Sequence, residues 1–195
     1  MFVGICVEGT SDIEAIKAIL TKLTEVNSKY KIRCEVRQYR GYPNLIHNLH
    51  QGLREFNKLY KADIITVIVD NDRNKRNQRF NEIAEKCEKE LCGEVVVIGV
   101  AVEALEAWLL SDEKALSKIV QRTIRAIRNP ENIKNPDVKL GEIVHINSLE
   151  KPYPEILKEI ALNLNLKNVS YRCRSFNSFR ESYVSKLKAV SKRKS

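Results

Sequence analysis

The chain has 195 residues, of which 43% are hydrophobic, which is enough for a packed core and excludes general disorder. Its 34 Lys and Arg residues against 25 Asp and Glu residues give a formal net charge of +9, which favours a polyanionic partner. The five cysteines lack the CxxC spacing and the His/Cys clustering of zinc sites. The apolar run at the N-terminus is too short for a signal segment or a membrane span, so we expect a cytoplasmic protein without membrane contact.

The first two predicted strands are each followed by a predicted helix. Residues 2–7 are an apolar run that predicts a strand, and residues 11–27 carry apolar side chains on one helical face, with Thr10 or Ser11 as candidate caps. Residues 31–40 alternate more strongly, which predicts a strand that is exposed on one face or lies at an edge. A helix with an apolar stripe from Leu45 to Tyr60 follows.

The third predicted strand, residues 63–70, is a continuous β-branched run of the kind that is buried on both faces of a parallel sheet. A basic stretch leads from it into a helix with apolar residues from Phe80 to Leu91, and residues 94–102 predict a fourth strand. This alternation indicates an α/β fold with a mostly parallel four-stranded sheet flanked by helices. The strand order 2-1-3-4 is a common one for doubly wound folds.

The character of the sequence changes after the fourth strand. Four prolines punctuate residues 129–154, and two apolar helices follow, one near residues 156–164 and one from Phe176 to Val190. We therefore divide the chain into an α/β core, residues 1–112, and a helical extension, residues 113–195, that packs on the core and ends in a basic tail.

Three carboxylates stand where parallel strands end. Glu8 follows the first strand, and Asp70 and Asp72 close the third. With the order 2-1-3-4 the first and third strands are neighbours at the switch point, so these side chains should converge. Oxygen ligands on a rigid sheet edge are what Mg²⁺ or Mn²⁺ requires. An acidic metal site in a basic protein suggests phosphodiester chemistry.

Three motifs together resemble the Toprim domain, the metal-dependent module of topoisomerases, DnaG-type primases and the nucleases of the overcoming-lysogenisation-defect (OLD) family. They are VEGTSD after the first strand, IVDND after the third and VAVEALEAWLL after the fourth. The chain is most similar to small stand-alone Toprim proteins of the OLD nuclease group. The similarity covers about residues 1–112, and RCRSFNSFR resembles an Arg-Ser-x-x-Phe element near the end of such proteins.

The resemblance implies roles for particular acids. Glu8 matches the glutamate of the first motif, Asp70 and Asp72 match the Asp-x-Asp pair, and Asp12 and Glu106 match further acids of the nuclease branch. Glu103, three residues before Glu106, is expected on the same helical face. These acids exceed the needs of one Mg²⁺ and suggest two ions about 3.5–4 Å apart.

Basic residues near the expected site are candidates for binding nucleic-acid phosphates. They form one set after the third strand and one near the C-terminus: Arg73, Lys75, Arg76, Arg79, Arg172 and Arg180. Arg174, or alternatively Arg180, is a candidate transition-state cation.

Simpler explanations exist for most of these residues. Asp12 could accept bonds from amides in the first helical turn, the basic stretch could be a solvated loop, and Trp108 is best explained as core. His47 and His50 are expected to be surface residues.

The favoured function is a metal-dependent nuclease using Mg²⁺ or Mn²⁺, with DNA preferred over RNA as substrate. An alternative is a non-catalytic nucleic-acid-binding module acting with a partner protein. A haloacid-dehalogenase-like phosphatase fits poorly, because its Asp-x-Asp lies on the first strand and because Asn74 stands where Thr or Val is needed. The chain carries no P-loop, so an ATPase, if required, would be a partner. The oligomeric state stays open.

Overall fold

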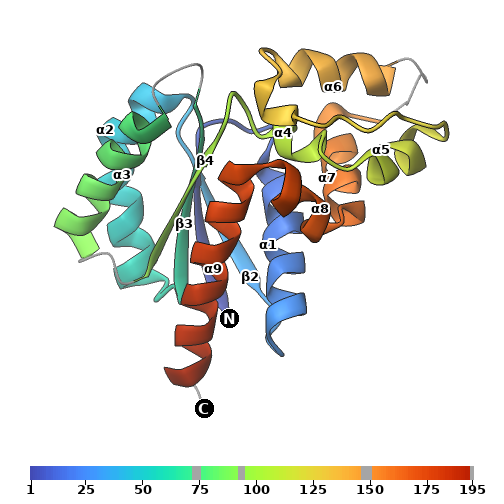
Figure 1. Ribbon diagram of the computed structural model, residues 1–195. Helices are drawn as coiled ribbons and strands as arrows, with labels where there is room; N and C mark the ends of the chain where they lie inside the picture. The colour runs from blue at the N-terminus through green and yellow to red at the C-terminus, as the bar shows by residue number, and fades with distance from the viewer. Residues whose placement is uncertain (72–75, 92–94, 146–150, 194–195) are drawn as a thin grey trace.

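The computed structural model describes residues 1–71, 76–91, 95–145 and 151–193, with the backbone alone for residues 76, 77 and 145. Its centre is a four-stranded sheet of β1 (Phe2–Val7), β2 (Arg33–Gln38), β3 (Ile64–Asp70) and β4 (Val96–Ala101). Every neighbouring pair is parallel, and the order is β2-β1-β3-β4 (Figure 1). This confirms the predicted fold class and strand order, and it places the ends of β1 and β3 side by side.

The burial of each strand follows from its place in the sheet. Residues 64–69 of β3 are all buried, as the continuous β-branched run predicts for a strand covered on both faces. β2 alternates between exposed and partly buried residues, which agrees with its position at one edge. The two inner strands therefore provide the rigid part of the scaffold.

One face of the sheet is covered by α2 (Tyr42–Arg54), the π-helical turn Glu55–Leu59 that continues it, and α3 (Arg76–Leu91) (Figure 1). Leu45, Leu49 and Phe56 from this layer pack against the sheet. Phe56 lies directly over Gly4 of β1, where a Cβ atom would come within 2.5 Å of its ring. Glycine at this position therefore permits the close approach of helix and sheet.

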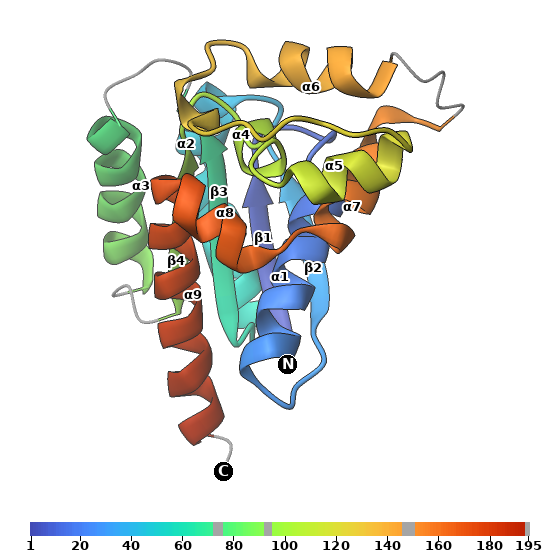
Figure 2. The ribbon, with the colours of Figure 1, turned by 45° about the vertical axis from the view of Figure 1, so that its right-hand side comes forward.

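The other face is covered by α1 (Ile13–Asn27) and α9 (Arg174–Arg193), and α7 (Tyr153–Asn163) packs against α1 (Figures 1 and 2). Trp108 is fully buried between Phe176 and Phe179, with ring centroids 5.2 Å and 5.7 Å apart, as its interpretation as core requires. The buried hydroxyl groups of Thr24 in α1 and Tyr183 in α9 are 2.8 Å apart. The hydrophobic cluster is thus continuous between residues 1–112 and the helices that follow.

The remaining described elements are α4 (Glu106–Leu109), α5 (Glu113–Val120), the 3₁₀ turn Pro130–Asn132, α6 (Pro136–His145) and α8 (Leu166–Arg172). Figure 2 shows α6 above the carboxyl ends of the strands and α8 in front of the sheet, beside the start of α9. Residues 121–135, here called the crossing segment, run from α5 across this end of the molecule to α6. Within the described ranges, no helix combines the length and the apolar composition that a membrane span needs.

Candidate acidic site at the strand ends

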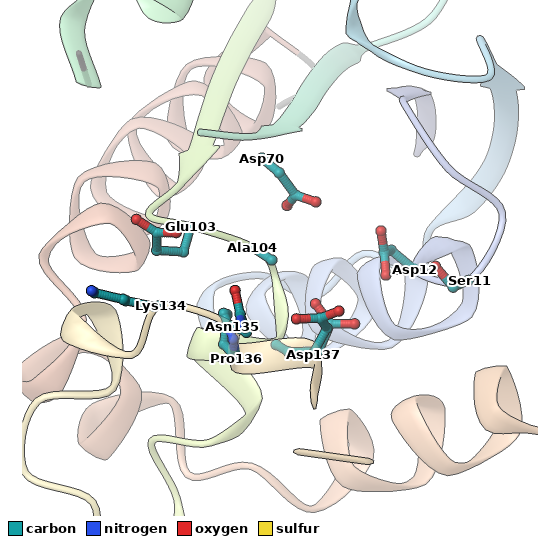
Figure 3. A pocket seen from close by; sticks show the side chains of 10 residues that line it. Ser11, Asp12, Asp70, Glu103, Ala104, Lys134, Asn135, Pro136 and Asp137 are labelled. Atoms are coloured by element: carbon teal, nitrogen blue, oxygen red, sulfur yellow. Dashed lines mark hydrogen bonds between the residues drawn. The ribbon is translucent and has the colours of Figure 1, made fainter. Parts of the chain in front are cut away.

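A cleft of about 430 Å³ opens at the carboxyl end of the sheet. The side chains around it are mostly acidic or polar and come from the strand ends, α4, the crossing segment and α6: Ser11, Asp12, Asp70, Glu103, Ala104, Glu106, Lys134, Asn135, Pro136 and Asp137. Figure 3 shows Asp12 and Asp70 directed into this space from two sides, with Asp137 and Asn135 on a third. The structure therefore brings together four predicted acids, Asp12, Asp70, Glu103 and Glu106, and adds Asp137.

Asp70 is the last residue of β3 and is fixed by the backbone that follows β4. Its Oδ1 accepts a hydrogen bond of 2.9 Å from the amide of Leu105, next to Glu106. One carboxylate oxygen is thus used to hold the turn before α4 against the end of β3. Because this bond sets the direction of the carboxyl group, Asp70 is presented to the cleft from a rigid position.

Glu8 lies beneath this cleft and joins the ends of β1 and β3. Its Oε1 accepts a 3.0 Å bond from the amide of Asp70 and forms a 3.2 Å ion pair with Nη1 of Arg79. The same Nη1 also donates to the carbonyl oxygen of Asp70, and the guanidinium carbon lies 4.1 Å from the centre of the Tyr42 ring. The ion pair of Glu8 and Arg79 therefore connects the ends of β1 and β3 to α3.

Arg79 was predicted to contact a nucleic-acid phosphate, but the structure places its side chain in the interior, next to Glu8. Its side chain is only 9% exposed, and that of Glu8 only 16%. The helical register of α3 turns Arg79 toward the sheet edge, so its charge compensates Glu8 and is not offered to a surface ligand. The remaining members of that basic set, Arg73 and Lys75 with the side chain of Arg76, lie outside the described residues, as does Asp72.

Asp12 immediately precedes α1, yet its side chain makes no capping bond to the first-turn amides. The expected caps Thr10 and Ser11 do not cap the helix either, because the chain makes a turn there and α1 begins at Ile13. Ser11 instead donates a 3.1 Å bond from its hydroxyl to Oδ1 of Asp12. Burial raises the pKa of Asp12 above its ordinary value, and the bond from Ser11 lowers it in part. Helix capping therefore does not account for this acid.

Glu106, the first residue of α4, is the most strongly perturbed acid of the cleft. It is 6% exposed, and burial, aided by the negative charges of Asp12 and Asp137, raises its pKa from 4.5 to about 7. The hydroxyl of Tyr153 donates a long hydrogen bond of 3.4 Å to Oε1 of Glu106. A carboxylate in this environment exchanges its proton near neutral pH.

A buried hydrogen-bond chain holds α4 in place behind Glu106. Nε1 of Trp108 donates a 2.8 Å bond to Oγ of Ser175, whose hydroxyl in turn donates to Glu131. Glu131 also accepts bonds of 2.9 Å from the amides of Arg174 and Ser175 at the start of α9. The acidic cleft is thus tied to the helical extension and to the crossing segment.

Glu103 lines the cleft, but it does not lie on the same helix as Glu106, as its spacing had predicted. Helix α4 starts only at Glu106, and Glu103 precedes it with a positive φ of 62°. The two glutamates therefore do not share a helical face. A left-handed conformation is unusual for a residue with a side chain and makes the sharp turn after β4 possible.

The three C-terminal arginines do not line the acidic cleft. Arg172 pairs with Glu113 and donates a 2.7 Å bond to the carbonyl oxygen of Ser111, so its charge serves to join α8 to α5. Arg174 lines a separate cleft, and Arg180 lies on α9 beside a further hollow near the end of α1. A role for Arg174 in the acidic cleft thus finds no geometric support in the part of the chain described.

Three lining residues with charged or amide side chains were missed by sequence reasoning: Lys134, Asn135 and Asp137. They follow one another closely in the Pro-punctuated stretch, where neither hydrophobic periodicity nor a strand end marks them. Their only local signal is the Asn-Pro-Asp sequence that starts α6. The sequence alone does not place these residues at the cleft, because their position depends on how residues 134–137 pack against distant parts of the chain.

The donor atoms of this site fit a hard divalent cation by type and charge. Glu8, Asp12 and Asp70 also border a gap of about 10 Å³ beneath the cleft, roughly the space of one water molecule. Within the described residues, however, no three His, Cys, Asp or Glu side chains are grouped so that they could hold a metal ion. The chemistry of the donors therefore suits Mg²⁺ or Mn²⁺, while a complete coordination sphere is not assembled.

Comparison with known proteins supports the fold and gives the family. No curated protein matches the sequence. The structure is similar to the C-terminal region of the Burkholderia pseudomallei OLD protein, with a TM-score of 0.51 and 11% sequence identity, over 96% of this chain and 98% of that chain. An identity this low shows a common fold. The family described as Domain of unknown function (DUF4276) matches residues 7–182, and the chain belongs to this family.

Proposed function

We propose that this protein is a metal-dependent nuclease that hydrolyses nucleic-acid phosphodiester bonds at the acidic cleft. The observation that carries the proposal is the convergence of Asp12, Asp70, Glu106 and Asp137 at the carboxyl edge of a parallel sheet in a chain of net charge +9. The Toprim-like motifs and the fold shared with the C-terminal region of an OLD protein support the same reaction class.

The charge balance of the cleft favours a bound cation. Several carboxylates share a half-enclosed space, and burial raises the pKa of both Asp12 and Glu106, which shows that their charged forms are disfavoured there. Lys134 is the basic side chain among the described residues that line the cleft. A phosphate alone would be repelled by such a site, whereas a divalent cation would compensate the carboxylates and attract the phosphate.

The residues can be given roles within this proposal. Asp12, Asp70 and Glu106, together with Asp72 by its motif, would hold Mg²⁺ or Mn²⁺. When bound, the metal would neutralise phosphate charge and lower the pKa of a coordinated water. Glu8 acts as a positioning residue, because its bond to the Asp70 amide fixes the strand end.

A further cleft residue can act on the substrate. The exposed Lys134 ammonium, on the wall of the cleft, can contact a non-bridging phosphate oxygen.

The test is cleavage of labelled single-stranded and duplex DNA and RNA in Mg²⁺, Mn²⁺ or EDTA. The variants Asp70→Asn and Glu106→Gln keep side-chain size while removing charge. Glu155→Gln is the matched control, because Glu155 is an exposed acid on α7 away from the cleft lining. We expect metal-dependent cleavage that is lost in Asp70→Asn and Glu106→Gln and retained in Glu155→Gln.

Three other results would overturn this proposal. Cleavage that persists in Asp70→Asn, or that is insensitive to EDTA, would remove the site from the reaction. Binding of nucleic acid without cleavage by wild type in any metal would instead favour a non-catalytic module acting with a partner.

A further inference from the structure

A second cleft, of about 770 Å³, lies between the crossing segment and the start of α9. Its lining is basic and aromatic where that of the acidic cleft is acidic, and it includes Arg128, Asn132, Tyr171 and Arg174. The proposed reaction uses none of these side chains.

The two clefts are lined by neighbouring residues of the crossing segment. Asn132 lines the second cleft, and Lys134, two residues later in the crossing segment, lines the acidic one. This part of the crossing segment is fixed, because Glu131 accepts hydrogen bonds from the amides of Arg174 and Ser175. A linear polymer with a phosphate in the acidic cleft would therefore have the second cleft as its neighbouring surface.

Tyr171 on α8 is the distinctive feature of the second cleft. It is 89% exposed, whereas Tyr39 is 7% exposed and Tyr183 is fully buried in the core. Tyr171 forms no hydrogen bond and no ring contact with the described residues. A large aromatic ring left in solvent beside a basic cleft can stack on a nucleobase, and stacking of this kind requires a base that is not already stacked in a duplex.

The charged groups of this cleft leave two cations for a ligand. The guanidinium groups of Arg128 and Arg174 form no ion pair with the described part of the chain. Arg172 is paired with Glu113, and Glu131 is engaged by the amides at the start of α9. Free guanidinium groups around an exposed ring are suited to the phosphates on either side of a stacked base.

We propose that the second cleft binds a single-stranded nucleic-acid segment that flanks the phosphate held in the acidic cleft. Tyr171 stacks on one base, and Arg128 and Arg174 contact the adjoining phosphates. The description of this segment as the flank of a scissile phosphate rests on the proposed function. Binding of a single strand at Tyr171 does not, so the two can be tested separately.

The experiment measures binding of fluorescently labelled oligonucleotides by anisotropy in EDTA, so that cleavage does not interfere. A single-stranded dodecamer and a blunt duplex of the same sequence are compared on wild type, Tyr171→Ala, Tyr171→Phe, Arg174→Gln and Arg33→Gln. Arg33 is the matched basic control, because it is exposed at the start of edge strand β2, at the opposite end of the sheet.

We expect Tyr171→Ala to weaken single-strand binding about 5- to 150-fold, the range for loss of one stacked base, while Tyr171→Phe stays near wild type. Duplex binding should be unaffected by either change. Arg174→Gln should reduce the slope of log K against log salt by about 0.7, the value for one phosphate contact with a single strand, and Arg33→Gln should leave it unchanged.

The outcomes separate this inference from the proposed function. Equal single-strand affinity of Tyr171→Ala and wild type, or no single-strand binding at all, would overturn the inference even if the protein cleaves nucleic acid. Loss of affinity in Tyr171→Ala with no cleavage in any metal would support this binding site and count against the nuclease. Equal weakening of duplex and single strand would refute base stacking.

Discussion

Replacing Glu106 with Gln should change how protein stability depends on pH. Glu106 is buried, and its pKa rises from 4.5 to about 7 because burial and the neighbouring Asp12 and Asp137 disfavour its charged form. The folded protein therefore binds this proton more tightly than the unfolded chain does. The resulting stabilisation is fully present below pH 4.5 and is lost as the pH rises through about 7.

The size of the effect follows from the two pKa values. A rise from 4.5 to about 7 corresponds to about 3 kcal/mol of unfolding free energy, of which about 2.5 kcal/mol is lost between pH 5 and pH 8. Gln at position 106 has nearly the same shape and can still accept the bond from Tyr153, but it does not titrate. The variant should therefore gain stability relative to wild type as the pH rises.

Urea unfolding of wild type and Glu106→Gln at pH 5 and pH 8, without divalent metal, measures this difference. We expect the stability difference between the two proteins to shift by about 2 to 3 kcal/mol in favour of the variant. Glu155→Gln, the exposed acid on α7, controls for loss of one negative charge. A Glu106→Gln difference that is the same at both pH values would refute the assignment of a proton to this buried carboxyl.

Two further predictions concern the scaffold of the site. Arg79→Leu should destabilise the protein by about 3 kcal/mol in urea unfolding, because it leaves the carboxylate of Glu8 buried and uncompensated. In the double variant, Glu8→Gln should recover part of this loss of stability. If the losses of the two single variants simply add, the two side chains are not coupled. Gly4→Ala should cost about 1–3 kcal/mol, because its Cβ would overlap the ring of Phe56, and should be rescued by Phe56→Leu. The control Gly9→Ala meets only contacts of 3.8 Å and should be mild; equal effects of the two alanines would contradict the close packing at Gly4.

The sequence was sufficient to predict the sheet because its determinants are local. Continuous β-branched strands, apolar helical stripes and short connections restrict the topology, and the observed order β2-β1-β3-β4 is the one expected. The same topology explains the meeting of Glu8 and Asp70. Once two parallel strands are neighbours, their terminal residues are neighbours too.

The orientations and bonding partners of individual side chains could not be predicted in this way. Arg79 and Asp12 illustrate why, because each had two sensible roles that differ only in rotation about one helix or one turn. Arg79 faces inward and pairs with Glu8, while Asp12 faces the cleft and leaves α1 without a side-chain cap. A shift of one residue in either register would exchange these roles without altering the hydrophobic pattern.

Asp137 shows a second limit, which concerns the boundary between core and extension. It lines the cleft together with Glu106 and contributes to the raised pKa of that residue, although it lies in the part of the sequence assigned to the helical extension. Trp108 and Ser175 join the same two parts through a buried hydrogen bond. The acidic cleft is therefore a product of both segments, because the sheet supplies carboxylates at fixed positions and the extension encloses them and raises the cost of their charge. That enclosure is the physical reason why a bound cation, as proposed, would favour full ionisation of the cleft at neutral pH.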